Sequence, residues 1–345
     1  MKILVTGGTG FIGCYFVDAL TKLGHELAIL DIHPFQHCEL ESLANVEYLQ
    51  GDIRDSGAVR NAIKGCNAVL HLAAAHHDFG ISEKTFYQVN VEGARVLCDE
   101  MTRANITSVC FYSTVAIYGQ AQPPVDEATP PAPVSPYGKT KLEGEKVFES
   151  WVSENNTNQC LVIRPTVTYG PGNFANMYTL IRQIDKGMFV PVGKGKNIKS
   201  LSYVENIVEA TNRIWFSEPL EKRFVAYNYV CKPDLSSHDI AETVYQALEK
   251  NSPRFNIPYF IARVLALPFD VIIKLTGKNL PVSGARIKKL ARAMTQYESE
   301  RIRAAGFEQQ ISVREGIERM VRWYQEKGKP IAESGLLNRR PLEKQ

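Results

Sequence analysis

The sequence predicts a Rossmann-type, doubly wound α/β fold that carries a smaller C-terminal α/β lobe. Over the first two-thirds of the 345 residues, short aliphatic runs alternate with longer amphipathic segments, and a glycine-rich turn follows the first run. This alternation indicates parallel strands joined by right-handed crossovers. Six runs have the aliphatic character of strands buried on both faces: 2–6, 26–31, 46–50, 68–73, 109–114 and 160–165. Helix-like stretches lie between them, at 11–23, 83–104 and 136–154.

The alternation ends after about Gly170. The segments that follow are mixed, with short strands expected near 189–204 and 224–230 and helices near 174–187, 205–216, 236–250 and 311–326. Mixed elements of this kind suit a smaller lobe that covers a substrate. The Lys-, Arg-, Glu- and Pro-containing tail is expected to be mobile.

The first expected turn, TGGTGFIG, has the spacing of a dinucleotide-binding loop. Gly7 permits the sharp turn, Gly10 lets the backbone approach a pyrophosphate, and Gly13 allows the helix to pack closely on the strand. The helix begins at Phe11 and Ile12, where unpaired N–H groups and the helix dipole favour phosphate groups.

Two acidic residues follow the next two strands. Asp31 ends the second strand, 18 residues after Gly13, where a carboxylate accepts hydrogen bonds from an adenosine ribose and repels a 2′-phosphate. NAD is therefore expected rather than NADP. Asp52, at the end of the third strand in GDIRD, is positioned to meet the adenine amino group.

SPYGKTK places Tyr137 and Lys141 four residues apart on one helix face. An ammonium group beside a phenol stabilises the phenolate, so we expect Lys141 to lower the pKa of Tyr137 from its usual value of about 10. Such a tyrosine can remove a proton from an alcohol near neutral pH. Thr114 follows the fifth strand, and its hydroxyl is expected at the sheet edge where open α/β sheets bind ligands.

Taken together, these motifs resemble the extended short-chain dehydrogenase/reductase superfamily, in particular its NAD-dependent epimerase/dehydratase branch. The resemblance covers residues 1 to about 325. It implies further cofactor contacts from Ile53 in GDIRD, from Leu72, Ala73 and Ala74 in HLAA, and from Asn90 in YQVNVEG. It also implies that Tyr137 and Lys141 contact the cofactor.

The resemblance implies a reaction in which Tyr137 takes the proton of a secondary alcohol, Thr114 holds the same oxygen, and nicotinamide takes the hydride. In a nucleotide-sugar 4-epimerase the oxidised sugar turns over and is reduced on its other face. The family also implies a homodimer formed through 83–104 and 136–154.

Departures from the family pattern narrow the reaction. Val115 and Ala116 follow Thr114 where 4,6-dehydratases carry Asp-Glu, so dehydration is not expected. Val167 replaces an asparagine that often contacts the sugar. Lys199 stands where an arginine often faces the diphosphate, and we name it as a substrate contact. Arg286 and Arg292 are further anion-binding candidates that stay unassigned.

We therefore predict an NAD-binding domain over 1–170, with a return of later segments to it left open, a mainly substrate-binding lobe over 171–327, and a mobile tail over 328–345. The predicted function is a nucleotide-sugar 4-epimerase or a related sugar-nucleotide oxidoreductase. A 3β-hydroxysteroid dehydrogenase-like enzyme is the alternative, supported by Val167 and an apolar late helix. A redox-sensing binding protein of the same fold is a third candidate, although such proteins commonly lack the catalytic pair.

Composition limits the partners. Forty Lys and Arg residues against 37 Asp and Glu give a net charge of +3, and no basic run points to nucleic acid. Seven dispersed cysteines form no CxxC pair, so we expect reduced thiols, a cytoplasmic protein and no metal site, even at His76, His77 and Asp78.

The apolar segment 257–275 is long enough to span a bilayer but contains Arg263, Asp270, Lys274 and two prolines. Charged groups at that depth are costly in lipid. We therefore expect a core or lid helix and no stable membrane insertion.

Overall fold

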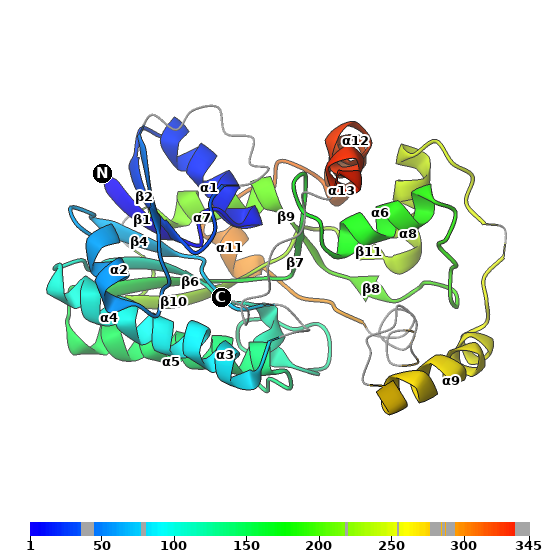
Figure 1. Ribbon diagram of the computed structural model, residues 1–345, viewed down its shortest axis with the longest axis horizontal. Coiled ribbons are helices and arrows are strands. Elements are labelled where there is room, and N and C mark those ends of the chain that lie inside the picture. The colour runs from blue at the N-terminus through cyan, green and yellow to red at the C-terminus, as the bar shows by residue number, and fades with distance from the viewer. Residues whose placement is uncertain are drawn as a thin grey trace.

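A computed structural model describes residues 1–35, 45–76, 81–217, 220–253, 255–276, 284, 287 and 294–334. It confirms the predicted fold class, with a parallel seven-stranded sheet in the order β10-β6-β5-β4-β1-β2-β3 (Figure 1). The six predicted strands are present as β1 (Lys2–Thr6), β2 (Glu26–Asp31), β3 (Val46–Gln50), β4 (Ala68–His71), β5 (Ser108–Tyr112) and β6 (Gln159–Pro165).

Helices cover both faces of this sheet. On one face lie α1 (Phe11–Lys22) and α7 (Val204–Trp215), which pack on each other. On the other lie α2 (Ser56–Ala62), α4 (Gly93–Arg103) and α5 (Pro136–Glu154). The predicted helix 83–104 is built from α3 (Glu83–Tyr87), a π-helical turn η1 (Gln88–Glu92) and α4. Alternate strand residues enter two separate cores, as Ile3 and Val5 do on the α1 face and Leu4 does on the α5 face. The strands are therefore aliphatic on both sides.

The strand order reverses beside β1, which pairs with β2 on one side and β4 on the other. At such a reversal the loops after neighbouring strands run in opposite directions and leave a crevice at the carboxyl edge of the sheet. The glycine turn after β1 opens into this crevice.

The smaller lobe is assembled from short elements. β7 (Val167–Tyr169) pairs in parallel with β9 (Leu201–Tyr203), and β8 (Ile198–Lys199) pairs with β11 (Leu235–Ser236) in the antiparallel sense. The helices of the lobe are α6 (Asn176–Asp185), α8 (Ser237–Ala247), α9 (Tyr259–Thr276) and α12 (Val313–Trp323). In Figure 1, α9 lies at the outer end of this lobe, far from β1.

Part of the segment after residue 170 returns to the main sheet, a possibility that the predicted domain boundaries left open. β10 (Phe224–Tyr229) lies within the range 171–327 and pairs with β6 at the edge of the main sheet. The helix α7 also returns to the sheet, and α11 (Glu300–Ala304) packs on β10. Val225 on β10 and Ile207 on α7 are buried in the core on one face of the main sheet, and a separate lobe would not bury them there.

The predicted tail is ordered at its start. η3 (Tyr324–Gly328) and α13 (Lys329–Glu333) extend α12, and Lys329 Nζ lies 3.0 Å from the Asp185 carboxylate. Residues 335–345 lie outside the described part.

Cys14 is part of a disulfide, contrary to the expectation of reduced thiols. Five other cysteines are free and buried: Cys66, Cys98, Cys110, Cys160 and Cys231. Among the described residues, no helix combines the length and hydropathy needed to cross a membrane.

Phe16 should contribute strongly to stability. Its ring is fully buried under the sheet and meets Tyr112 edge to face at 5.5 Å. We expect Phe16→Ala to lower the free energy of unfolding by about 3–5 kcal/mol, because it leaves a cavity. Leu23→Ala, at a position that is 58% exposed, should change it by less than about 0.5 kcal/mol. Urea denaturation measures both, and equal midpoints would contradict this account of the core.

Candidate active site

Thr114 and Tyr137 meet at the carboxyl edge of the sheet. Thr114 follows β5 and starts the short 3₁₀ segment η2 (Val115–Tyr118), where its hydroxyl accepts a 3.2 Å hydrogen bond from the N–H of Ala116. Tyr137 lies in the first turn of α5, and its hydroxyl is close enough to the Thr114 side chain for that side chain to lower the pKa of the phenol. The two residues, 23 positions apart in sequence, thus present their hydroxyl groups together.

Local sequence brings these two segments into contact. Ser135 caps α5 by accepting a hydrogen bond from the N–H of Gly138, and Pro136 occupies the first helical turn. A Cβ atom at Gly138 would lie 2.6 Å from the carbonyl oxygen of Ala116. Only glycine allows the first turn of α5 to lie this close to η2, and that approach places Tyr137 beside Thr114.

The pKa of Tyr137 differs from the expectation. Burial raises the pKa of this phenol to about 12, and the hydrogen bond with Thr114 opposes the rise. The helical spacing alone predicts that Lys141 lowers the pKa of Tyr137. In the protein without a bound cofactor, burial has the larger effect on the pKa of Tyr137, because the phenolate loses its contact with water.

Lys141 is buried one helical turn beyond Tyr137. Its side chain is only 2% exposed, and Nζ lies 4.1 Å from the centroid of the Phe111 ring. Burial lowers the pKa of Lys141 to about 7, while the nearby Glu145 carboxylate acts to raise it. Near neutral pH the amine therefore holds its proton only partly, and its charge depends on its immediate surroundings.

Glu145 belongs to a buried ionic network that the sequence did not reveal. Arg164 on β6 forms two hydrogen bonds with the Glu145 carboxylate, at 3.0 and 2.6 Å. The same guanidinium donates to the Tyr118 hydroxyl at 2.8 Å, and that hydroxyl donates to Asn228 on β10 at 2.8 Å. The spacing could have indicated this contact, because Glu145 follows Lys141 by four residues, as Lys141 follows Tyr137, and residues four apart lie on the same face of a helix.

The glycine loop has the geometry that a dinucleotide requires. Gly7 has a φ of +72°, and a Cβ atom there would lie 2.6 Å from the backbone nitrogen of Ala73. A Cβ atom at Gly13 would lie 2.5 Å from the carbonyl oxygen of Gly7. α1 begins at Phe11 without a side-chain cap, so its first N–H groups face the crevice unpaired by a capping side chain. The residues present therefore fit a pyrophosphate.

The two acidic residues after β2 and β3 have different surroundings. The Asp31 carboxylate accepts hydrogen bonds from the backbone N–H groups of Thr9, at 3.2 Å, and His33, at 3.1 Å, which fix it beside the glycine loop. Asp52 binds Arg54 through paired hydrogen bonds of 2.9 and 2.5 Å. Burial opposes ionisation of Asp52, but the bonds to Arg54 hold its pKa below the usual value.

The remaining predicted cofactor contacts surround the ends of β3 and β4. Ile53 is buried beneath Gly93, while Leu72, Ala73 and Ala74 are partly exposed after β4. Asn90 has a role that the sequence did not predict. Its amide bonds both backbone groups of Ala75, at 2.8 and 3.0 Å, and the Thr140 hydroxyl at 3.0 Å. Asn90 therefore braces the loop after β4 against α5.

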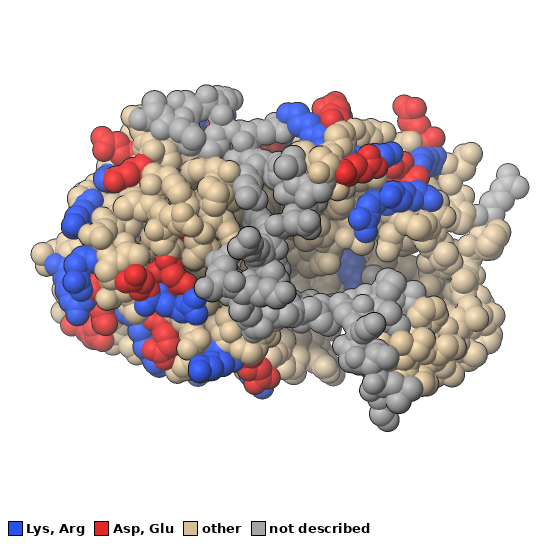
Figure 2. All heavy atoms as spheres, viewed as in Figure 1, with Lys and Arg blue, Asp and Glu red and all other residues tan. Residues whose placement is uncertain are grey.

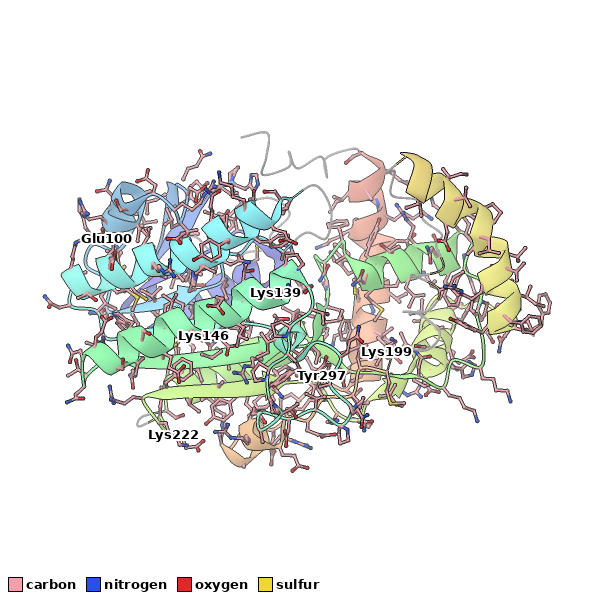
Figure 3. All side chains as sticks on the ribbon, turned by 90° about the horizontal axis from the view of Figure 1, so that it is seen from below. Glu100, Lys139, Lys146, Lys199, Lys222 and Tyr297 are labelled. Carbon is pink, nitrogen blue, oxygen red and sulfur yellow. The ribbon has the colours of Figure 1, made fainter. Side chains whose placement is uncertain are left out.

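Residues of the other lobe are farther from this group. Lys199 lies on β8 and pairs through its backbone with Thr295, and Figure 3 shows it in the smaller lobe, apart from Lys139 at the start of α5. Figure 2 shows a hollow in the surface between the sheet and the smaller lobe. His76 is described and exposed, whereas His77, Asp78, Arg286 and Arg292 lie outside the described residues. No group of three His, Cys, Asp or Glu side chains suited to a metal occurs within the described ranges.

A large groove of about 970 Å³ lies at the opposite edge of the sheet. It is lined by residues at the amino ends of strands, including Met1, Asn67 and Gln159. In open α/β sheets ligands bind outside the carboxyl ends of the strands, so this groove is separate from the candidate active site.

Comparison with known proteins identifies the family of this chain. The model of the NAD dependent epimerase/dehydratase family matches residues 3–218. The chain belongs to this family. The resemblance inferred from the motifs is thereby confirmed, and this epimerase/dehydratase is an enzyme of the extended short-chain dehydrogenase/reductase type, a type that depends on NAD.

Relatives of this epimerase/dehydratase include 4-epimerases. It is 34% identical over 324 residues to the N-acetyl-alpha-D-glucosaminyl-diphospho-ditrans,octacis-undecaprenol 4-epimerase of Escherichia coli O157:H7, a match that covers 93% of this chain and 95% of that relative. It is 26% identical over 288 residues to the UDP-glucose 4-epimerase of Vibrio cholerae, covering 80% of this chain and 85% of that one.

Solved structures agree on the fold. The UDP-glucose 4-epimerase of Thermus thermophilus in complex with NAD superposes with a TM-score of 0.73 at 22% identity, covering 95% of this chain and 100% of that chain. A UDP-galactose 4-epimerase gives the same TM-score and identity, over 95% of this chain and 99% of its own.

Glu145→Gln should shift the titration of Lys141. Loss of the carboxylate removes the group that raises the pKa of Lys141, so this pKa should fall below about 7 and the ammonium form should disappear at a lower pH. Glu149→Gln, at an exposed position on the same helix, is the matched control. The ¹³Cε chemical shift of labelled lysine followed against pH measures the change. An unaltered Lys141 titration in folded Glu145→Gln protein would show that the network does not tune the amine.

Proposed function

We propose that this protein catalyses NAD-dependent 4-epimerisation of a hexose or N-acetylhexosamine that is carried on a diphosphate. The observation that supports this most is the 34% identity to an undecaprenyl-diphosphate sugar 4-epimerase over nearly the whole of both chains. The placement of Tyr137 beside Thr114, with Lys141 one turn further along α5, supports it independently, because hydride transfer at a secondary alcohol requires a base next to the cofactor.

The cofactor would be held along the carboxyl edge of β1 to β4. The backbone from Gly7 to Gly13 and the start of α1 would bind the pyrophosphate, and Asp31 would bind the adenosine ribose. Asp52 and Ile53 would border the adenine, and Leu72, Ala73 and Ala74 would line the path to nicotinamide. Bound NAD would supply the hydride acceptor and, on return, the hydride donor.

The chain's own residues would manage the proton. Tyr137 would take the proton of the C4 hydroxyl while the Thr114 hydroxyl holds the same oxygen, and Tyr137 would return the proton after the sugar has turned over. Lys141 in its ammonium form would favour the phenolate and bind the nicotinamide ribose. Two positive charges, on Lys141 and on the oxidised cofactor, would together offset the burial that holds the pKa of Tyr137 near 12.

The residues after Thr114 favour epimerisation over 4,6-dehydration. Val115 and Ala116 occupy positions from which a dehydratase needs ionisable groups to move protons at C5 and C6. Neither side chain can exchange a proton. Epimerisation, unlike 4,6-dehydration, does not require ionisable side chains at positions 115 and 116.

The sterol alternative rested partly on the apolar segment 257–275. In the structure the large apolar side chains of α9 face outward from the lobe, so they do not favour a sterol pocket. Homodimerisation through α3–α4 and α5, which adjoin one another on one face, and a cytoplasmic location stay predictions.

Tyr137→Phe should lower epimerisation about 10²–10⁴-fold, since no other group takes its proton-transfer role. Binding of NAD, measured by fluorescence quenching, should stay within about twofold. Tyr87→Phe, at a 42% exposed tyrosine, is the matched control and should retain full activity. Product analysis over a panel of UDP-, GDP- and dTDP-hexoses and polyprenyl-diphosphate sugars measures turnover. A Tyr137→Phe enzyme that keeps most of its activity would refute the assigned role.

Asp31→Ala should weaken the preference for NAD over NADP by at least about tenfold, because the 2′-phosphate would no longer meet a carboxylate. Asp99→Ala, at an exposed position on α4, removes the same charge away from the loop and should leave the preference unchanged. The ratio of dissociation constants for the two cofactors reports the effect. Identical ratios in both variants would remove Asp31 from the cofactor site.

A further inference from the structure

The helix α9 has its apolar and polar faces reversed relative to an ordinary surface helix. A surface helix normally turns its large apolar side chains toward the core and its charged ones toward water. On α9 eight large apolar side chains point to solvent, with exposed fractions from 38% to 68%. They are Phe260, Ile261, Val264, Leu265, Leu267, Phe269, Val271 and Ile272.

These side chains form one continuous surface. At about 100° per residue they span an arc of about 200°, and among the α9 residues whose side chains the structure describes, the other exposed residue within that arc is Pro268. In Figure 2 the described residues of α9 that face the viewer have the colour of residues other than Lys, Arg, Asp and Glu. An exposed apolar patch of this kind marks a surface that binds something.

The opposite side of α9 makes the contacts with the protein. Ala262 and Ala266 are buried there, and Arg263 and Asp270 are partly buried. The Asp270 carboxylate accepts a 2.9 Å hydrogen bond from the backbone N–H of Gly284. Small and polar residues thus hold α9 on the rest of the protein, while its large apolar side chains are exposed to solvent.

The start of α9 is fixed to the lobe. The backbone N–H of Ile257 donates to the carbonyl of Pro191 at 2.9 Å, and the carbonyl of Ile257 accepts from Gly193 at 2.9 Å. The apolar arc is therefore presented from a defined place on the lobe rather than from a free terminus.

The sequence around α9 is basic. Residues 251–295 contain eight of the 40 Lys and Arg residues but only one of the 37 acidic residues, Asp270. This segment carries a net charge of +7, so the remainder of the chain carries −4. A basic segment joined to an apolar helix supplies both the electrostatic and the hydrophobic attraction that peripheral binding to anionic lipids requires.

We propose that α9 docks this protein on an anionic membrane surface, with the helix in the plane of the interface and its apolar arc among the acyl chains. A second copy of the chain is a poorer occupant, because a symmetric contact would bring two segments of charge +7 together. A soluble protein partner is also disfavoured, since the side chains of this arc that the structure describes carry no hydrogen-bonding group, which makes it more apolar than ordinary transient interfaces.

Docking at a membrane would also indicate which group carries the sugar substrate, an inference that rests on the proposed function. A sugar attached through a diphosphate to a polyprenol stays at the bilayer surface, because the lipid anchors it there. An enzyme held at that surface by its smaller lobe would reach such a sugar without extracting the lipid. The substrate class assigned in this way is a polyprenyl-diphosphate sugar rather than a free nucleotide sugar.

Co-sedimentation of the full chain with vesicles tests the docking. Wild-type protein should bind vesicles of phosphatidylglycerol and phosphatidylcholine, bind phosphatidylcholine alone much more weakly, and be released by salt. The V264E/L265E variant should bind the anionic vesicles at least about tenfold more weakly. M188E/V190E is the matched control, because it also replaces two exposed apolar residues of the lobe with glutamate, and it should bind like wild type. Circular dichroism and NAD binding establish that each variant is folded.

The other outcomes overturn the docking. Membrane docking is refuted if wild-type protein does not bind the vesicles. It is also refuted if V264E/L265E and wild-type protein bind them equally well. A wild-type dimer that V264E/L265E converts to monomers, without vesicle binding, would assign α9 to self-association instead.

A second assay separates docking from the proposed function. With a polyprenyl-diphosphate N-acetylhexosamine embedded in vesicles, V264E/L265E should lose turnover at least about tenfold relative to M188E/V190E. Epimerisation of nucleotide sugars without vesicle binding would refute docking and leave the proposed function standing. Vesicle binding without epimerisation of either carrier would refute the proposed function and leave docking standing.

Discussion

The site depends on one buried cation. Lys141 sits in an apolar setting against Phe111, where an ammonium group is costly, and its charge is supported from one helical turn away by Glu145. Glu145 is itself buried and is tolerable only because Arg164 pairs with it through two hydrogen bonds. The charge of Lys141 is thus connected, through Glu145, to a guanidinium on β6. Removing Glu145 or Arg164 alone leaves the other buried charge without its partner.

The sheet explains how these groups come together. Parallel strands place all their carboxyl ends at one edge, so Thr114 after β5, Arg164 on β6 and the glycine loop after β1 converge although they are far apart in sequence. Two close backbone approaches complete the arrangement. Gly7 lets the first turn pass the chain after β4, and Gly138 lets α5 touch η2. The same edge consequently brings the glycine loop and the proposed base, Tyr137, to one side of the sheet.

The elements that could be predicted from the sequence are those with a local residue pattern. The aliphatic runs of β1, β2 and β6 are buried on both faces, and this burial shows directly in their composition. The FVAYNY segment of β10 is equally strand-like, but composition does not tell which sheet a strand joins, so the sequence left open whether it belongs to the main sheet. Contacts across long sequence separations, such as Arg164 with Tyr118 or Asn90 with Thr140, leave no local pattern. The outward face of α9 was missed because periodicity alone does not say which side meets the protein.

The return of β10 to the main sheet has a consequence for how such an enzyme can change. The chain enters the smaller lobe after β6, comes back for α7 and β10, and leaves again for β11 and α8. No single cut in the polypeptide therefore separates the part that would hold the cofactor from the part that would hold the sugar. New specificities could not be acquired by exchanging a contiguous cassette, and must arise by substitutions and loop insertions within a scaffold inherited whole.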